Sequence, residues 1–110
     1  MNNYPIVIKS YQFTVWYIKK LERLPRNHRY TLGEKIQNEC LELLMILTET
    51  IYSREKKRLL TQANQHIEKL RILSRLMHDL GLISEDNKRY ILSNLQEIGA
   101  MSGGWIKQLK

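Results

Sequence analysis

Apolar residues recur every three or four positions along most of this 110-residue chain, which is the pattern of helices that each bury one face. One run comprises Leu32, Ile36, Cys40, Leu43, Leu44, Leu47 and Ile51. A second comprises Leu59, Ala63, Ile67, Leu70, Leu73, Leu76, Met77 and Leu80. A third comprises Ile91, Leu95, Ile98, Met101 and Trp105. The polar side of the first run carries Glu34, Lys35, Asn38, Glu39, Glu42 and Glu49. The spacing predicts an all-α fold.

Proline and charged residues mark the first two breaks between these runs. Pro25 lies in a polar stretch, so we expect one helix to end there and another to follow. Thr31 and Glu34 have the spacing of a capping box, which favours a helix start at this point. The second break, at residues 53–58, is strongly charged.

Gly81 and Ser84 mark the last connection. Glycine readily takes the left-handed conformation that closes a helix, and a serine hydroxyl accepts a hydrogen bond where the next helix begins. Gly103 and Gly104 are expected to weaken the final helix near its end, by about 1 kcal/mol each relative to alanine.

These breaks divide the chain into four predicted helices, near residues 8–24, 29–53, 56–81 and 85–109. Because the connections are short, consecutive helices are expected to run antiparallel. We therefore predict a single domain over residues 1–110, folded as an antiparallel up-down four-helix bundle.

The first predicted helix is apolar over a wide arc. One stripe comprises Tyr11, Val15 and Ile18, and a second comprises Phe13, Trp16, Tyr17, Lys20 and Leu24. A helix of this kind either lies centrally or contacts a second chain as well as its own core. The β-branched residues before Ser10 lower the helix propensity of that part.

The charge balance is strongly basic. Eighteen lysines and arginines face eleven acidic residues, which gives a formal net charge of +7 and a pI near 9.7. Residues 1–29 hold six basic side chains against one acidic, and residues 54–81 hold seven against three, whereas residues 30–53 are acidic. Such a field attracts polyanions; the alternative is that it serves solubility alone.

The basic residues nominated for binding nucleic acid or a partner fall into three groups. They are Lys19, Lys20, Arg23, Arg26 and Arg29 at the first turn, Arg54, Lys56, Lys57 and Arg58 at the second, and Arg71 and Arg75, with Lys69, between them. Antiparallel packing places the two turns at opposite poles, and we expect the third group to join them into a stripe for a phosphate backbone. No base-reading motif is present, so recognition without strong sequence preference is expected. The alternative is a solvated face whose charges form pairs such as Glu68 with Arg71.

No reactive constellation accompanies this charge. The Gly103–Gly104 pair lacks the following lysine of a phosphate-binding loop, and His28, His66 and His78 do not have the spacing of a helical metal site. Cys40 lies on an apolar face, so burial is expected rather than nucleophilic use. We therefore expect no catalytic activity, no metal and no cofactor.

The sequence also favours a cytoplasmic setting. A single cysteine excludes an internal disulfide framework, and the longest apolar stretch, Leu43–Leu47, is too short to span a bilayer. Residues 1–9 lack the features of a secretory signal. No membrane association is expected.

Several short patterns recur together in one order. Trp16 precedes Leu24-Pro25-x-x-x-Arg29-Tyr30-x-Leu32-Gly33, and the chain closes with Glu97-Ile98-Gly99-x-x-x-Gly103-Gly104-Trp105-Ile106-Lys107. The chain resembles the accessory variability determinant (Avd) of diversity-generating retroelements. That family belongs to a wider four-helix-bundle group with the proteins encoded in intervening sequences of bacterial 23S ribosomal RNA genes.

The resemblance implies a barrel-like homopentamer without catalytic activity. It also implies binding to the retroelement's reverse transcriptase and to its template RNA or cDNA, in support of mutagenic retrohoming. The alternative is a protein-interaction scaffold of the ribosomal-RNA group. The motif residues Pro25, Arg29, Leu32 and Gly33 would shape the first turn, and Gly103, Gly104 and Trp105 the C-terminus.

Overall fold

A computed structural model describes residues 4–109 of the chain. Its long helices are α1 (Pro5–Leu21), α3 (Glu34–Tyr52), α4 (Lys56–Asp79) and α5 (Glu85–Gln108). Two short elements, α2 (Arg26–His28) and the π-helical turn η1 (Arg29–Gly33), precede α3. Residues 1–3, part of the segment expected to lack a secretory signal, and residue 110 lie outside the described range.

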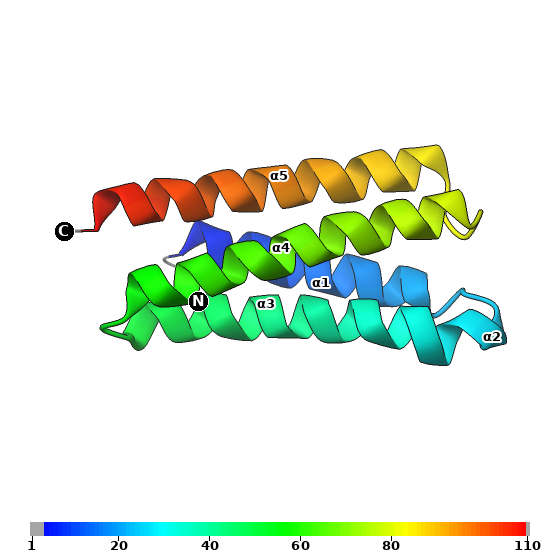
Figure 1. The fold of residues 1–110 in the computed structure, drawn as a ribbon, viewed down its shortest axis with the longest axis horizontal. Helices are drawn as coiled ribbons and strands as arrows, with labels where there is room; N and C mark the ends of the chain where they lie inside the picture. The colour runs from blue at the N-terminus through cyan, green and yellow to red at the C-terminus, as the bar shows by residue number, and fades with distance from the viewer. Residues whose placement is uncertain (1–3, 110) are drawn as a thin grey trace.

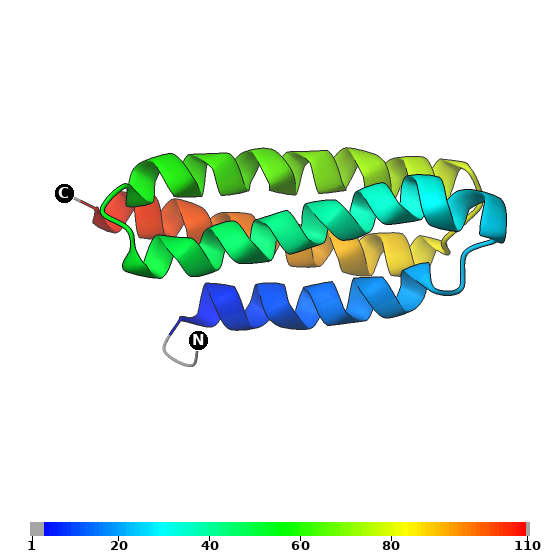
Figure 2. The same ribbon diagram turned by 90° about the horizontal axis from the view of Figure 1, so that it is seen from below.

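The four long helices run alternately up and down along a body of 46 × 22 × 22 Å (Figure 1). Two views at right angles place α1 beside α3 and α5, and α4 diagonally across from α1 (Figures 1 and 2). No strand occurs among residues 4–109. The all-α prediction is therefore confirmed, and the helices have the arrangement of an antiparallel four-helix bundle.

The first helix begins earlier and ends earlier than predicted, at Pro5 and Leu21 rather than near residues 8 and 24. Proline suits the first turn of a helix because its missing N–H has no partner there. Ile6 and Val7 are both buried in the core, so packing outweighs their low helix propensity.

The capping box predicted at Thr31 is wrong. The backbone N–H groups of His28 and Arg29 donate to the carbonyl of Pro25, so the helical segment that leads into α3 starts directly after the proline. The Thr31 hydroxyl instead donates to the carbonyl of Asn27, at 3.2 Å, inside a turn that is already helical. The helical segment therefore begins at Arg26, with Pro25 as its N-cap, and not near residue 29 as predicted.

The predicted last connection is confirmed. Gly81 has φ of +74°, and the N–H of Leu82 donates to the carbonyl of Met77 at 2.9 Å, which closes α4. The Ser84 hydroxyl accepts from the N–H of Asn87 at 3.0 Å and caps α5. α5 continues unbroken through Gly103–Gly104 to Gln108.

The core follows most of the predicted apolar runs. Its largest fully buried side chains are Tyr17, Phe13, Ile36, Leu43, Leu47, Leu60, Leu70, Met77, Ile91, Leu95 and Ile98. Three residues of the predicted runs lie outside the core: Leu76, Leu80 and Met101 are exposed, because their positions fall at the edge of the buried arc.

Glu39, expected on the polar side of its helix, is buried. Its carboxylate lies 2.8 Å from Nδ1 of His66 on α4, so it is accommodated by a polar contact between two helices. Cys40, beside it, is buried as predicted.

Candidate nucleic-acid interface

The end of α1 and the first turn carry five basic residues, here called the first-turn pole: Lys19, Lys20, Arg23, Arg26 and Arg29. The buried Leu21 and Leu24 fix this segment to the bundle, which leaves the charged residues between and after them at the surface. Among residues 4–109, no carboxylate oxygen lies within 4.0 Å of a side-chain nitrogen of the pole. Its positive charge is therefore not neutralised by local ion pairs.

Two contacts hold side chains of this pole in place. Nη2 of Arg29 donates to the carbonyl of Leu24 at 3.2 Å, and Nζ of Lys20 lies 5.4 Å from the ring centroid of Trp16. Both are contacts to uncharged groups, so both cations keep their net charge.

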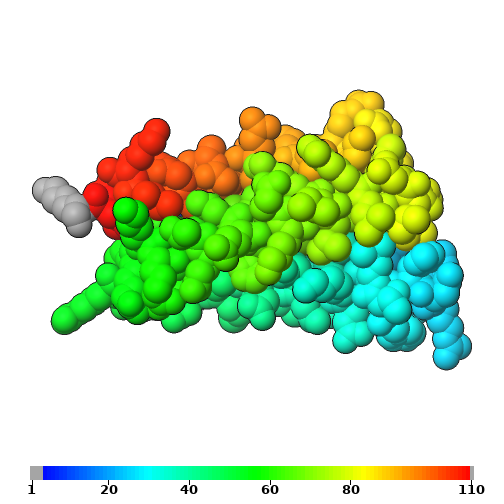
Figure 3. Space-filling model, viewed as in Figure 1, coloured from blue at the N-terminus to red at the C-terminus, as the bar shows by residue number. Residues whose placement is uncertain are grey.

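The second turn lies at the opposite end of the molecule, as predicted; Figure 3 shows residues near 26–30 (cyan) projecting from one end and residues near 54 (green) at the other. Two of its basic side chains make hydrogen bonds within the protein, unlike most of those at the first-turn pole. Arg58 donates to Glu55 at 2.8 Å, which lowers the pKa of that carboxyl. Nζ of Lys56 donates to the carbonyls of Thr50 and Ile51 and so satisfies the C-terminus of α3. Within the described range, Arg54 and Lys57 have no ion pair.

The predicted stripe along α4 does not form. Nζ of Lys69 lies 3.7 Å from the buried Glu39 of α3, whereas Arg71 lies 3.5 Å from Glu68 and beside Gly99 of α5. The two side chains thus flank α4 on opposite sides, because they are two positions apart on a helix. Arg75 is exposed, but α4 lies diagonally across the bundle from the first-turn pole.

Sequence reasoning missed an aromatic pair beside the first-turn pole. The rings of Trp16 on α1 and Tyr90 on α5 lie 4.5 Å apart between centroids, and Tyr90 is 45% exposed. Trp16 also lines a surface hollow whose other walls are Lys19, Lys20 and Arg23. Tyr90 directly precedes the buried Ile91 and so lies off the apolar stripe of its helix, the one signal that could have revealed it.

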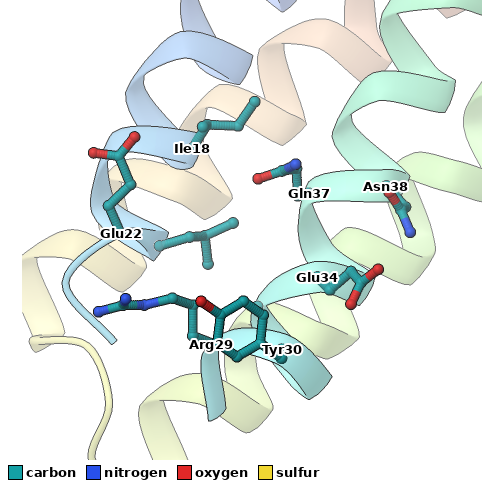
Figure 4. Close-up of a pocket in the computed structure, with 9 residues that line it drawn as sticks. Ile18, Glu22, Arg29, Tyr30, Glu34, Gln37 and Asn38 are labelled. Carbon is teal, nitrogen blue, oxygen red and sulfur yellow. The ribbon is translucent and has the colours of Figure 1, made fainter. Parts of the chain in front are cut away.

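A cleft between α1 and α3, which shares Arg29 with the first-turn pole, has mixed charge (Figure 4). Ile18 forms part of its apolar wall, and Glu22, Glu34 and Arg29 lie around it with Tyr30. Two carboxylates against one guanidinium do not suit a phosphate backbone, so Arg29 belongs to the candidate interface and the acidic side of this cleft does not.

The model of the bAvd-like family matches residues 6–109. The chain belongs to the bAvd-like family. This confirms the resemblance found in the sequence, and the matched range includes both the first-turn and the C-terminal patterns. The comparison with curated proteins gave no match.

Two of the motif residues of this bAvd-like chain, Gly33 and Trp105, have packing roles in the structure. A Cβ on Gly33 would lie 3.0 Å from Cδ1 of Leu24, so glycine permits the close approach of the first turn to α3. Trp105 stacks on Tyr4 with ring centroids 5.7 Å apart and joins the C-terminus to the start of α1.

Two exposed apolar patches lie on other faces of the bAvd-like bundle. Exposed apolar residues recur at four-residue spacing on α1, α3 and α4. Tyr11 and Val15 of α1, with Leu41 and Met45 of the neighbouring α3, are here called the α1–α3 patch, and Ile72, Leu76 and Leu80 are called the α4 patch. Apolar side chains grouped in this way often mark contacts with other proteins. The first patch contains two residues of the α1 stripe that suggested a second-chain contact.

The described residues contain no group of three or more His, Cys, Asp or Glu side chains that could hold a metal ion. Burial raises the pKa of the Cys40 thiol to about 12, which disfavours the nucleophilic thiolate. Within residues 4–109, no helix has the length and apolar character needed to cross a membrane.

Proposed function

We propose that this bAvd-like protein is a non-catalytic, cytoplasmic accessory subunit of a diversity-generating retroelement. It binds the template RNA or the cDNA and the reverse transcriptase, and thereby supports mutagenic retrohoming. The observation that carries the nucleic-acid part is the first-turn pole, where five basic side chains gather without a carboxylate partner within residues 4–109.

Unpaired cations favour a polyanion for a physical reason. A cation already paired with a carboxylate must lose that partner before it gains a phosphate, whereas an unpaired one releases only water and counterions. Among the residues that the structure describes, the first-turn pole meets this condition at all five positions. At the second turn, Arg58 already donates to Glu55 and Lys56 donates to the carbonyl of Thr50. We therefore assign a secondary role in nucleic-acid binding to the second turn, and also to Arg71 and Arg75.

We propose further that the protein assembles into a ring, as the family resemblance implies for a homopentamer. A closed ring needs two different, complementary patches on each subunit, because its interfaces are heterologous. The α1–α3 patch and the α4 patch supply two such surfaces on different faces of the bundle. The subunit number of five rests on the resemblance.

A protein-interaction scaffold is the second candidate function. The mixed-charge cleft of Figure 4 favours it, because Glu22, Arg29 and Tyr30 offer a polar and aromatic edge suited to a polypeptide. In this case the basic residues recognise an acidic protein surface. Reversal of charge at Arg23, Arg26 and Arg29 would then abolish the protein complex and leave weak nucleic-acid binding intact.

The test is to compare nucleic-acid affinity across matched variants. We expect the Lys19→Gln/Arg23→Gln/Arg26→Gln variant to lose at least about tenfold in affinity for RNA at low salt, since three phosphate contacts are removed. A control that also removes three positive charges, at residues outside the nominated groups, is Lys35→Gln/Arg89→Gln/Lys107→Gln; it should lose much less.

Equal losses in the two variants would mean that net charge, not the first-turn pole, attracts the nucleic acid. Absence of binding by the unaltered protein at low salt would overturn the proposal. Co-purification of the reverse transcriptase with each variant tests the partner independently of RNA.

A further inference from the structure

The surface between α1 and α5 combines aromatic rings with basic side chains. Trp16 and Tyr90 lie 4.5 Å apart with their ring planes inclined by 44°, and Tyr90 is 45% exposed. Lys20 lies 5.4 Å from the Trp16 ring, and Lys19 and Arg23 complete the hollow beside it. These five residues form the α1–α5 site.

The sequence explains why the five residues meet. Lys19, Lys20 and Arg23 follow Trp16 by three, four and seven positions, which places them along one side of α1. That side faces α5, since Lys9 of α1 pairs with Glu97 of α5 at 2.5 Å. Tyr90, seven positions before Glu97, therefore lies two turns along α5 on the side that faces α1.

The acidic residues in the first turn of α5 contact other groups. Glu85 contacts His78 at 2.9 Å and Lys88 at 3.2 Å, and Asp86 lies 3.7 Å from Arg89. Within the described range, neither carboxylate lies within 4.0 Å of a cation of the α1–α5 site. The three cations of the site are thus available to a ligand.

We infer that the α1–α5 site binds unpaired nucleotides, so that the protein's ligand is single-stranded rather than duplex nucleic acid. A base stacks on the exposed Tyr90, next to Trp16, and the adjacent phosphates contact Lys19, Lys20 and Arg23. A duplex offers its phosphates but not its base faces, so it gains from the cations alone. Stacking on an aromatic side chain contributes about 1–3 kcal/mol per base and tolerates any sequence.

This inference rests on the nucleic-acid binding proposed above, and it is tested by removing the aromatic ring without removing charge. Binding of the full-length protein to a labelled oligothymidylate, an oligouridylate and a duplex of equal length is measured for Tyr90→Ala. We expect about a tenfold loss for both single strands and less than about a twofold loss for the duplex. Tyr90→Phe should retain the affinity of the unaltered protein.

Tyr52→Ala is the matched control. Tyr52 is 82% exposed and is the last residue of α3, at the end of the bundle opposite to the first turn. Its removal should leave single-strand binding unchanged. Equal losses for Tyr90→Ala and Tyr52→Ala, or equal losses on single strands and duplex, would overturn the inference.

A second measurement observes Trp16 directly. With Trp105→Phe, Trp16 is the one remaining tryptophan of the chain, and oligothymidylate should quench its fluorescence more strongly than duplex at equal occupancy. If Tyr90→Ala has no effect while the Lys19→Gln/Arg23→Gln/Arg26→Gln variant loses binding, this inference fails and the proposed function stands. If the unaltered protein binds neither ligand at low salt, both fail.

Discussion

Tyr17 and Ser74 link the two diagonal helices of the bundle through the centre of its core. Their hydroxyl oxygens lie 2.8 Å apart, and both residues are fully buried. Burial raises the pKa of Tyr17, in agreement with a hydroxyl that stays protonated in an apolar environment. The hydrogen bond satisfies two polar groups that water does not reach.

Removal of one partner should therefore destabilise the protein. We expect Tyr17→Phe to lower the free energy of unfolding by about 1–2 kcal/mol, because the Ser74 hydroxyl is left buried without its partner. The double variant Tyr17→Phe/Ser74→Ala should recover part of that loss. Urea denaturation followed by circular dichroism measures both, and a double variant that is no more stable than Tyr17→Phe would contradict this explanation.

Cys40 gives a second test at this scale. Burial raises the pKa of this thiol to about 12, which leaves very little reactive thiolate at neutral pH, and the side chain is fully buried. We expect a thiol reagent such as DTNB to react very slowly with the folded protein and rapidly in denaturant. Rapid reaction of the folded protein would contradict the buried position.

The burial of some single residues could be predicted from the sequence, and that of others could not. Cys40 could be predicted as buried because it falls on the apolar stripe of α3. Glu39 could not, because its burial depends on His66, which lies 27 positions away on another helix. Tyr90 was missed for a similar reason, since its contact with Trp16 joins the first and last helices.

At the scale of the elements, glycines have opposite roles in two places. Gly81 has φ of +74°, whereas Gly104 lies inside α5, where an added Cβ would meet no neighbouring atom within 4 Å. Gly81→Ala should lower stability by about 1 kcal/mol, because alanine is strained at positive φ. Gly104→Ala should raise it by up to about 1 kcal/mol. Thermal denaturation compares the two variants, and effects of the same sign would contradict these assignments.

The helices could be predicted from periodicity, and their boundaries only in part. Gly81 and Ser84 act locally, so their roles were visible in the sequence. The capping box at Thr31 failed because Pro25 starts the helical segment earlier. α1 begins at Pro5 because Ile6 and Val7 gain from burial, which local propensity does not include.

At the scale of the whole molecule, the two apolar patches predict which substitutions would break the proposed ring. Met45 is 58% exposed, and Val15 lies in the same α1–α3 patch. We expect Val15→Glu/Met45→Glu to convert the proposed ring into smaller species, because buried unpaired carboxylates are costly at an interface. Sedimentation measures the mass, and circular dichroism checks that the bundle remains folded. An unchanged mass would contradict the role of this patch.

Antiparallel helices place the two basic turns at opposite poles, and this was predictable from the order of the elements. The basic stripe expected to join them does not form. Lys69 and Arg71 lie on different sides of α4, near the carboxylates of Glu39 and Glu68, and the sequence alone did not reveal these contacts. Net charge can be counted in a sequence. Which cations remain unpaired depends on the packed structure.

The salt dependence of nucleic-acid binding tests the central claim most directly. For single strands, each phosphate contact contributes about 0.7 to the slope of log affinity against log salt concentration. We predict that Lys19→Gln/Arg23→Gln/Arg26→Gln reduces the magnitude of that slope by about 2, since three contacts are lost. A slope unchanged from that of the unaltered protein would contradict the claim that the first-turn pole holds the phosphate backbone.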